Sequence, residues 1–130
     1  MKKLFAEQAD TLKVMTYATD IRPITSPIPL SQALEGVQGL DWSLCPDTKL
    51  TVSGVSVSSI DIEDNWLFVA IPGLVQHGIR FLHAAVEAGA TAVVTDREGS
   101  ERAREMNPDI PIVIVADPRR ASATIAANIY

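Results

Sequence analysis

The stretch "NWLFVAIPGLVQHGIRFLHAAVEAGATAVVTD", Asn65 to Asp96, predicts a strand, a loop, a helix and a second strand, in that order. Its first part, Trp66 to Ile71, is an apolar run too short for a typical helix, and a Pro-Gly pair stops it, as expected for a strand buried on both faces. Apolar residues at helical spacing then predict a helix over 81–88, which Gly89 ends. The run from Thr91 to Asp96 predicts another buried strand. Two apolar strands joined by a helix indicate a parallel sheet.

The segments on either side extend this unit. Before it, Leu50 to Val57 alternates with a period of two and predicts a strand that ends in a serine pair. After it, the charged run "SERAREM" predicts a helix, and Ile110 to Asp117 predicts a further strand. Asp117 can cap a last helix whose first residue is Pro118. The order strand, strand, helix, strand, helix, strand, helix predicts the α/β class, with a small, mostly parallel sheet flanked by helices and joined by right-handed crossovers.

The N-terminal part follows a different pattern. Arg22 to Leu30, "RPITSPIPL", holds three prolines and predicts an extended connector. Ser31 can cap a short helix, "SQALEGV", which the two glycines Gly36 and Gly39 end. We therefore divide the chain into an N-terminal extension over 1–48 and a domain over 49–130. The last helix reaches Tyr130 without a stop signal, so it either frays there or continues into a longer protein.

The composition excludes several classes of protein. The 130 residues are 47% hydrophobic and 21% charged, which is typical of one folded domain. A net charge of -5 provides no broad basic surface for nucleic acid. Cys45 is the only cysteine, so an internal disulfide and a multi-cysteine metal site are excluded, and a reducing cytoplasm is the expected setting. We find neither a signal peptide nor an apolar run long enough to span a membrane.

Parallel sheets bind ligands at the carboxyl ends of their strands, and three loops lie there. In the first loop, the hydroxyl groups of Ser58 and Ser59 can hydrogen-bond a polar ring or a phosphate, although serines also simply end strands. In the second loop, "PGLVQHG", Gln76 offers an amide and His77 precedes the helix. A histidine at such a position is also typical of an ordinary surface loop. Residue types alone leave both alternatives open.

The third loop, "ADPRRA", places Arg119 and Arg120 in the first turn of the last helix, where they meet either an anionic ligand or only solvent. The acidic run over 61–64 predicts a solvated loop and no metal site, because one turn seldom supplies convergent ligands. Neither Gly-Lys-Ser/Thr nor Gly-x-Gly-x-x-Gly occurs, so these residues are expected to hold no ATP and no dinucleotide. No catalytic residue is predicted.

The stretch "GVSVSSIDIEDNWLFVAIPGLVQHGIRFLHAAVEAGATAVVTD", 54–96, resembles the N-terminal domain of the Mur ligases. The family pattern there runs G-V-x-x-D-S-R-x-V-x-P-G-D-L-F-V-A-x-x-G-x-x-x-D/H-G-x-x-F-I-x-x-A-x-x-x-G-A-x-A-V-V. The matching residues are Gly54, Val55, Ser59, Leu67, Phe68, Val69, Ala70, Gly73, Gly78, Phe81, Ala85, Gly89, Ala90, Ala92, Val93 and Val94. "VIVADPRRASATIAANIY" is similar to the segment that closes the domain, so the resemblance covers about 50–130 and is greatest to the MurE branch.

The resemblance implies a role for the domain over 49–130. It would hold the UDP end of UDP-N-acetylmuramoyl-L-alanyl-D-glutamate, a UDP-MurNAc-dipeptide, for a cytoplasmic peptidoglycan ligase that forms a peptide bond with an added amino acid. The family's UDP contacts fall on Val57, Ser59, Leu74, Val75 and Gln76, and relatives carry Asp or His where His77 stands. ATP and Mg²⁺ would bind a central domain, and a C-terminal domain would present the amino acid. The family's phosphate loop is absent from these residues, so alone they should be inactive.

Two departures from the family pattern bear on this role. Where the family has Asp-Ser-Arg, this chain has Ser58, Ser59 and Ile60, so a charge-assisted hydrogen bond to a diphosphate is lost. Where the family has Pro-Gly-Asp, the chain has "DNW" over 64–66. The alternative function is a free-standing, non-catalytic relative that binds a UDP-sugar or a protein.

Overall fold

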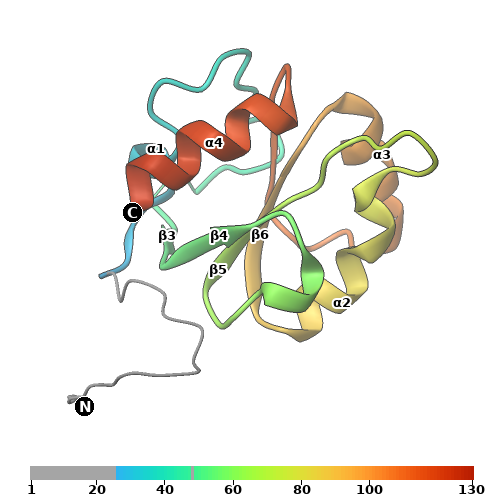
Figure 1. Cartoon of the computed structure of the whole chain (residues 1–130), viewed down its shortest axis with the longest axis horizontal. Coiled ribbons are helices and arrows are strands. Elements are labelled where there is room, and N and C mark those ends of the chain that lie inside the picture. Colours follow the sequence, from blue (N-terminus) through green and yellow to red (C-terminus); the bar gives the residue numbers. More distant parts are fainter. Residues whose placement is uncertain (1–25, 48) are drawn as a thin grey trace.

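A four-stranded sheet forms the centre of the computed structural model, which describes residues 26–47 and 49–130. Its strands are β4 (Gly54–Ser56), β5 (Trp66–Val69), β6 (Ala90–Thr95) and β7 (Ile112–Ile114), and they lie side by side in that order (Figure 1). Each neighbouring pair is parallel. The prediction of a small parallel sheet is confirmed.

Helices cover both faces of this sheet. Helices α1 (Leu30–Ala33) and α4 (Pro118–Ile129) lie on one side, while α2 (Leu82–Glu87) and α3 (Arg97–Met106) lie on the other (Figure 1). There are also two short 3-10 helices among the described residues. The first, η1 (Ser59–Asp61), follows β4, and the second, η2 (Gly78–Phe81), directly precedes α2. From β4 onward the strands and α-helices follow the predicted order.

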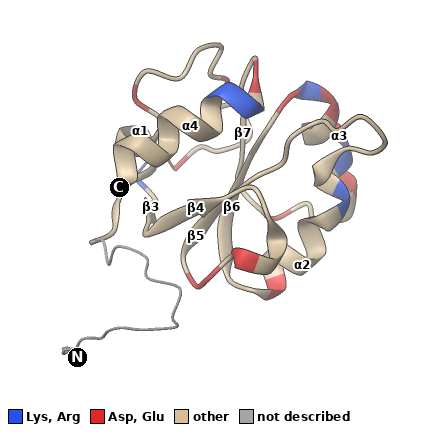
Figure 2. Ribbon diagram, in the orientation of Figure 1, with Lys and Arg blue, Asp and Glu red and all other residues tan. Residues whose placement is uncertain are grey.

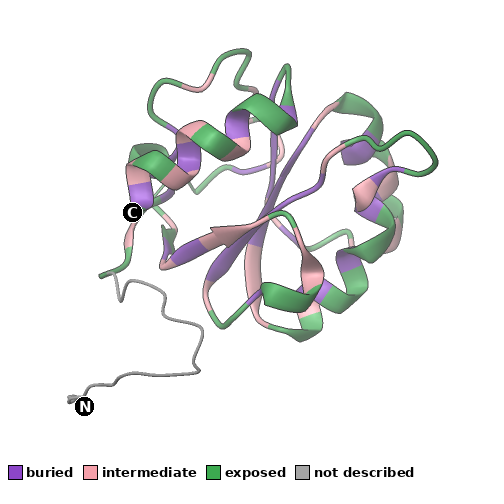
Figure 3. Cartoon of the chain, in the orientation of Figure 1, coloured by how far each residue is buried: buried purple, intermediate pink, exposed green. Residues whose placement is uncertain are grey.

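The buried strands divide their side chains between two cores, as the period of two requires. On β5, Leu67 and Val69 join the core beneath α1 and α4, whereas Trp66 and Phe68 join the core beneath α2 and α3. All four side chains are buried, and the sheet is covered on both faces in Figure 3. This double burial explains why β5 is an uninterrupted apolar run.

The predicted strand over 50–57 is two strands. Its first half, β3 (Thr51–Val52), pairs antiparallel with β2 (Ile28–Pro29) in a small separate sheet, while β4 joins the main sheet. The break falls at Ser53, whose backbone N–H donates to the carbonyl of Asn65 at 2.9 Å. The prediction of one strand was wrong because the period of two continues through a change of pairing partner.

Two helix starts also differ from the predictions. The first helix, α1, begins at Leu30 after Pro29, with no side-chain cap, so the prediction that Ser31 caps it was wrong. Helix α3 begins at Arg97, before the predicted run "SERAREM", because Asp96 caps it. By contrast, Asp117 caps α4 as predicted: its Oδ1 accepts a hydrogen bond from the Arg120 N–H at 3.2 Å.

Residues before the predicted boundary at 48 contribute to the fold. Leu30, Ala33, Leu34 and Cys45 have no exposed surface and lie in the core beneath α4. The proline-rich connector falls partly outside the described residues, and its described part contains β2. The division into 1–48 and 49–130 stays a prediction. Among the described residues, no helix has the length and apolarity needed to cross a membrane.

Candidate ligand site at the carboxyl edge of the sheet

The structure brings the first two predicted loops to the same edge of the sheet. Strands β4 and β5 are parallel neighbours, with Val55 opposite Leu67 and Ser56 opposite Phe68. Their carboxyl ends therefore lie together, and the loops over 57–60 and 72–77 leave from that edge. This is the position at which open parallel sheets bind ligands.

The first loop presents a mixed polar and apolar surface. Val57 is half exposed, and the Ile60 side chain is 90% exposed. The Ser56 hydroxyl accepts a hydrogen bond from the Ser58 N–H at 3.0 Å, which bends the chain after β4. Ser59 then begins η1 and is partly exposed. The exposed Ile60 stands where the family pattern has arginine.

The second loop closes on itself as a tight turn. Pro72 and His77 form an antiparallel bridge, and the Gly73 N–H donates to the carbonyl of Gln76 at 3.1 Å. Leu74 and Val75 at the tip are fully exposed apolar side chains. Exposed apolar groups on a tight loop give an apolar contact surface, while Gln76 beside them adds an exposed amide.

His77 is buried, so the interpretation of an ordinary surface histidine was wrong. Only 5% of the residue is exposed. Its Nδ1 accepts a hydrogen bond from the Ile79 N–H at 3.0 Å, and its Nε2 lies 2.9 Å from Oδ1 of Asp96. Both ring nitrogens are thus occupied within the protein, and its proposed contact with the ligand stays a prediction.

Sequence reasoning missed Asp96 as a partner of this loop. The residue ends β6, and its Oδ1 also accepts a hydrogen bond from the Gly99 N–H at 2.8 Å, which caps α3. The available signal was an aspartate directly before a charged run that predicts a helix, which is the position of a helix cap. The contact with His77 has no signal in the sequence because 19 positions separate the two residues.

The two loops contain no cationic side chain. Arginines of the described residues lie largely on α3 and at the start of α4 (Figure 2). Arg80 in η2 is exposed, and its guanidinium carbon lies 5.3 Å from the centre of the Phe81 ring. An anionic ligand at the loops would therefore depend mainly on N–H and hydroxyl donors.

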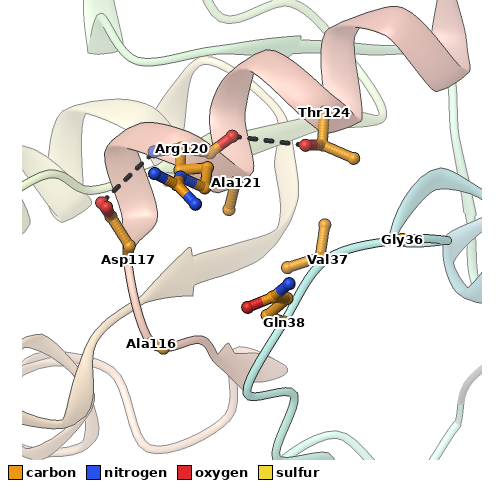
Figure 4. A pocket seen from close by; sticks show the side chains of 8 residues that line it. All are labelled: Gly36, Val37, Gln38, Ala116, Asp117, Arg120, Ala121 and Thr124. Carbon is orange, nitrogen blue, oxygen red and sulfur yellow. Dashed lines mark hydrogen bonds between the residues drawn. The ribbon is translucent and has the colours of Figure 1, made fainter.

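A hollow of about 300 Å³ lies at a different place, between α4 and the loop after α1 (Figure 4). Arg120, Ala121 and Thr124 line it from the helix, and Val37 and Gln38 line it from the loop. None of the six predicted contact residues contributes to this lining. The third predicted loop contributes Ala116, Asp117, Arg120 and Ala121 to this lining, and the Arg120 side chain is exposed.

Among the residues that the structure describes, Asp41 and Cys45 have shifted pKa values, and both lie outside the two loops. Hydrogen bonds from Ser43, with the Arg97 guanidinium 3.3 Å away, hold the pKa of Asp41 below its usual value. Burial, with the nearby Asp47 carboxylate, raises the pKa of the Cys45 thiol, which favours an inert thiol. Within 26–47 and 49–130, no group of three or more His, Cys, Asp or Glu side chains could hold a metal ion.

The family model and the similar proteins found by comparison all belong to one kind of ligase. The model described as "Mur ligase family, catalytic domain" matches residues 51–130. A UDP-N-acetylmuramoyl-L-alanyl-D-glutamate--2,6-diaminopimelate ligase from Streptomyces avermitilis is 35% identical over 117 residues, covering 89% of this chain and 22% of that protein. The ligase of the same name from Caldanaerobacter subterraneus subsp. tengcongensis is also 35% identical, over 94 residues, covering 72% of this chain and 18% of its own length. The chain thus spans about a fifth of these relatives.

A solved structure supports the fold. A crystal structure of MurF from Acinetobacter baumannii superposes with a TM-score of 0.61 at 20% identity, covering 82% of this chain and 21% of that one. At this identity the likeness concerns the fold alone.

Proposed function

The chain belongs to the Mur ligase family, and from this premise we propose that it holds the UDP end of UDP-N-acetylmuramoyl-L-alanyl-D-glutamate for a peptide-bond-forming ligase. The names of the similar ligases contain this dipeptide substrate. The proposed setting is peptidoglycan synthesis in the cytoplasm. The amino acid that is added would be selected elsewhere in the full protein.

The observation that carries the proposal is the juxtaposition of two loops at the carboxyl edge of β4 and β5. Val57, Leu74 and Val75 are exposed apolar side chains that suit the faces of a nucleoside. Ser59 and Gln76 add a hydroxyl and an amide that suit the polar edge of a uracil or the oxygens of a diphosphate. His77, at the end of the second loop, is the sixth residue of the proposed set.

The residues of this chain do not fit ATP and Mg²⁺. The loop after β5 has no lysine, and the described residues hold no cluster of carboxylates for a divalent cation. In the proposed full-length ligase, a central domain binds ATP and Mg²⁺, a C-terminal domain presents the amino acid, and this chain alone is inactive.

One observation favours a second candidate, a non-catalytic module that binds a UDP-sugar or a protein. Ile60 is 90% exposed where the family pattern has an arginine. An exposed isoleucine beside an exposed apolar loop suits a protein contact better than a diphosphate.

Calorimetric titration with UDP-N-acetylmuramoyl-L-alanyl-D-glutamate tests the proposal. Each of Ser59→Ala and Gln76→Ala removes one neutral hydrogen-bonding group and should weaken binding about threefold to tenfold. Ile60→Arg should strengthen binding about tenfold, because it restores a charge-assisted hydrogen bond to the diphosphate.

Gln32→Ala is the matched control, because Gln32 is an exposed glutamine on α1 rather than on either loop. It should bind as the unchanged protein does. Equal affinity for the unchanged protein, Ser59→Ala and Gln76→Ala would remove the site assignment. No binding by either the unchanged protein or Ile60→Arg would favour the protein-binding module.

A further inference from the structure

The hydrogen bonds of the His77 ring favour one tautomer. Its Nδ1 accepts a hydrogen bond from the Ile79 N–H at 3.0 Å, so this nitrogen carries no proton. The proton of the neutral ring is then on Nε2, which donates to Oδ1 of Asp96 at 2.9 Å. The ring thus joins the start of η2 to the end of β6 through two hydrogen bonds.

Asp96 binds two partners with the same oxygen. Its Oδ1 accepts from the His77 ring and from the Gly99 N–H in the first turn of α3. A Cβ at Gly99 would lie 2.8 Å from Cε1 of His77 and would also collide with the Thr95 hydroxyl, so only glycine lets α3 approach the ring so closely. We call the pair the His77–Asp96 clamp.

The clamp attaches the second loop to the end of β6 and the start of α3. His77 closes the loop by its bridge to Pro72, and beyond it Leu74 and Val75 are fully exposed and make no packing contribution. The buried ring therefore fixes one stem of a loop whose tip is surrounded by solvent. Without the ring, the tip would be held mainly by backbone hydrogen bonds of the turn.

We propose that His77 is a positioning residue, which through Asp96 and α3 holds the 72–77 loop in the conformation that receives the nucleotide. This inference rests on the proposed function for its ligand. A loop that is ordered before binding loses less conformational entropy when the ligand arrives. Loosening the clamp should weaken binding about tenfold, the equivalent of newly ordering the backbone of about one residue.

Two substitutions at Asp96 separate positioning from simple loss of stability. Asp96→Ala removes the acceptor for both His77 and Gly99, whereas Asp96→Asn keeps a carbonyl oxygen that can accept both hydrogen bonds. In the full chain, Asp96→Ala should bind UDP-N-acetylmuramoyl-L-alanyl-D-glutamate about tenfold more weakly, and Asp96→Asn should bind within about threefold of the unchanged protein. Amide exchange at Gly73 and Gly78, whose N–H groups close the loop, should accelerate in Asp96→Ala alone.

Asp117→Ala is the matched control, because Asp117 caps α4 in the same way but does not contact the second loop. It should lower stability without changing loop exchange or affinity. Should Asp96→Ala fail to fold by circular dichroism, His77→Asn replaces it: asparagine can still cap η2 but is too short to reach Asp96.

The exchange measurement is made on the free protein, so it separates the two proposals. Absence of ligand binding by the unchanged protein would overturn the proposed function. It would also remove the nucleotide as the ligand for which the clamp positions the loop. Unchanged exchange at Gly73 and Gly78 in a folded Asp96→Ala or His77→Asn would overturn the clamp even if the ligand binds. Equal losses of affinity in Asp96→Ala and Asp117→Ala would also overturn it, since a general loss of stability would then explain both.

Discussion

Asn65 adopts a left-handed backbone conformation, with φ at +66°. It occupies the turn before β5, where its N–H donates to the Gly89 carbonyl and its own carbonyl accepts from the Ser53 N–H, both at 2.9 Å. Its side-chain Nδ2 also donates to the Ser53 hydroxyl at 3.2 Å. Asparagine tolerates this conformation better than other residues with a Cβ, which accounts for its replacing the glycine of the family pattern.

Substitutions at Asn65 test whether this position requires a left-handed backbone conformation. Asn65→Val should lower the free energy of unfolding by about 2 kcal/mol, because a β-branched side chain is strained at positive φ. Asn65→Gly keeps the backbone conformation and should cost only about 0.5 kcal/mol through the lost hydrogen bond to Ser53. Urea unfolding monitored by circular dichroism measures both values. Equal costs for valine and glycine would contradict a conformational requirement at this position.

At the same scale, the sequence predicted which residues lie at the edge but not how His77 is used. Leu74, Val75 and Gln76 are exposed in a loop that a Pro-Gly pair marked in advance. His77 is buried against Asp96, and no local pattern reveals a contact between residues that only the parallel pairing of β5 and β6 brings together. Contacts across neighbouring strands depend on register, and a strand that is buried on both faces lacks the alternation that would specify it.

At the scale of secondary-structure elements, two helices begin at an aspartate cap. The carboxylates of Asp96 and Asp117 each accept a hydrogen bond from the N–H three residues later, at the start of α3 and α4. The cap of α4 was predictable because Pro118 follows Asp117. The cap of α3 was missed because Asp96 is the last residue of "TAVVTD", a run that predicts a strand. The strand over 50–57 was mispredicted for a related reason: β3 and β4 share one alternating pattern although they pair in different sheets.

The cap of α4 gives a prediction about stability. Asp117→Ala should lower the free energy of unfolding by about 1 kcal/mol, because one N–H at the start of the helix loses its acceptor. Asp117→Ser keeps a capping oxygen and should remain within about 0.5 kcal/mol of the unchanged protein. Thermal and urea unfolding of the three proteins provide the comparison. A serine variant as unstable as the alanine variant would indicate that the charge, rather than the cap, stabilises this helix.

At the scale of the molecule, the sheet is stable only when both of its faces are covered. The face beneath α4 depends on the N-terminal segment, since Leu30 and Leu34 are completely buried there. The Asn128 side chain adds two hydrogen bonds of 2.8 Å to the carbonyls of Ala33 and Glu35. The sequence did not predict these contacts. A proline-rich segment followed by a four-residue helix is more typical of a linker than of part of a core.

Truncation tests where the folding unit begins. A protein of residues 26–130 keeps the contacts that α1 and β2 make with the rest of the described residues and should unfold cooperatively. A protein of residues 49–130 loses Leu30 and Leu34, and each buried leucine contributes about 2–5 kcal/mol by comparison with alanine. That loss is similar to the whole stability of a typical domain, about 5–15 kcal/mol, so the shorter protein should not fold cooperatively.

Urea unfolding of the two truncated proteins decides between the boundaries. If 49–130 unfolds cooperatively, with a free energy within about 1 kcal/mol of that of 26–130, the boundary at 48 marks a real domain. If only 26–130 folds, the segment with α1 belongs to the unit that presents the two loops. Loss of the nucleotide site in 49–130 would then follow from an uncovered sheet face rather than from any missing contact residue, because Val57, Ser59 and the 72–77 loop are all retained.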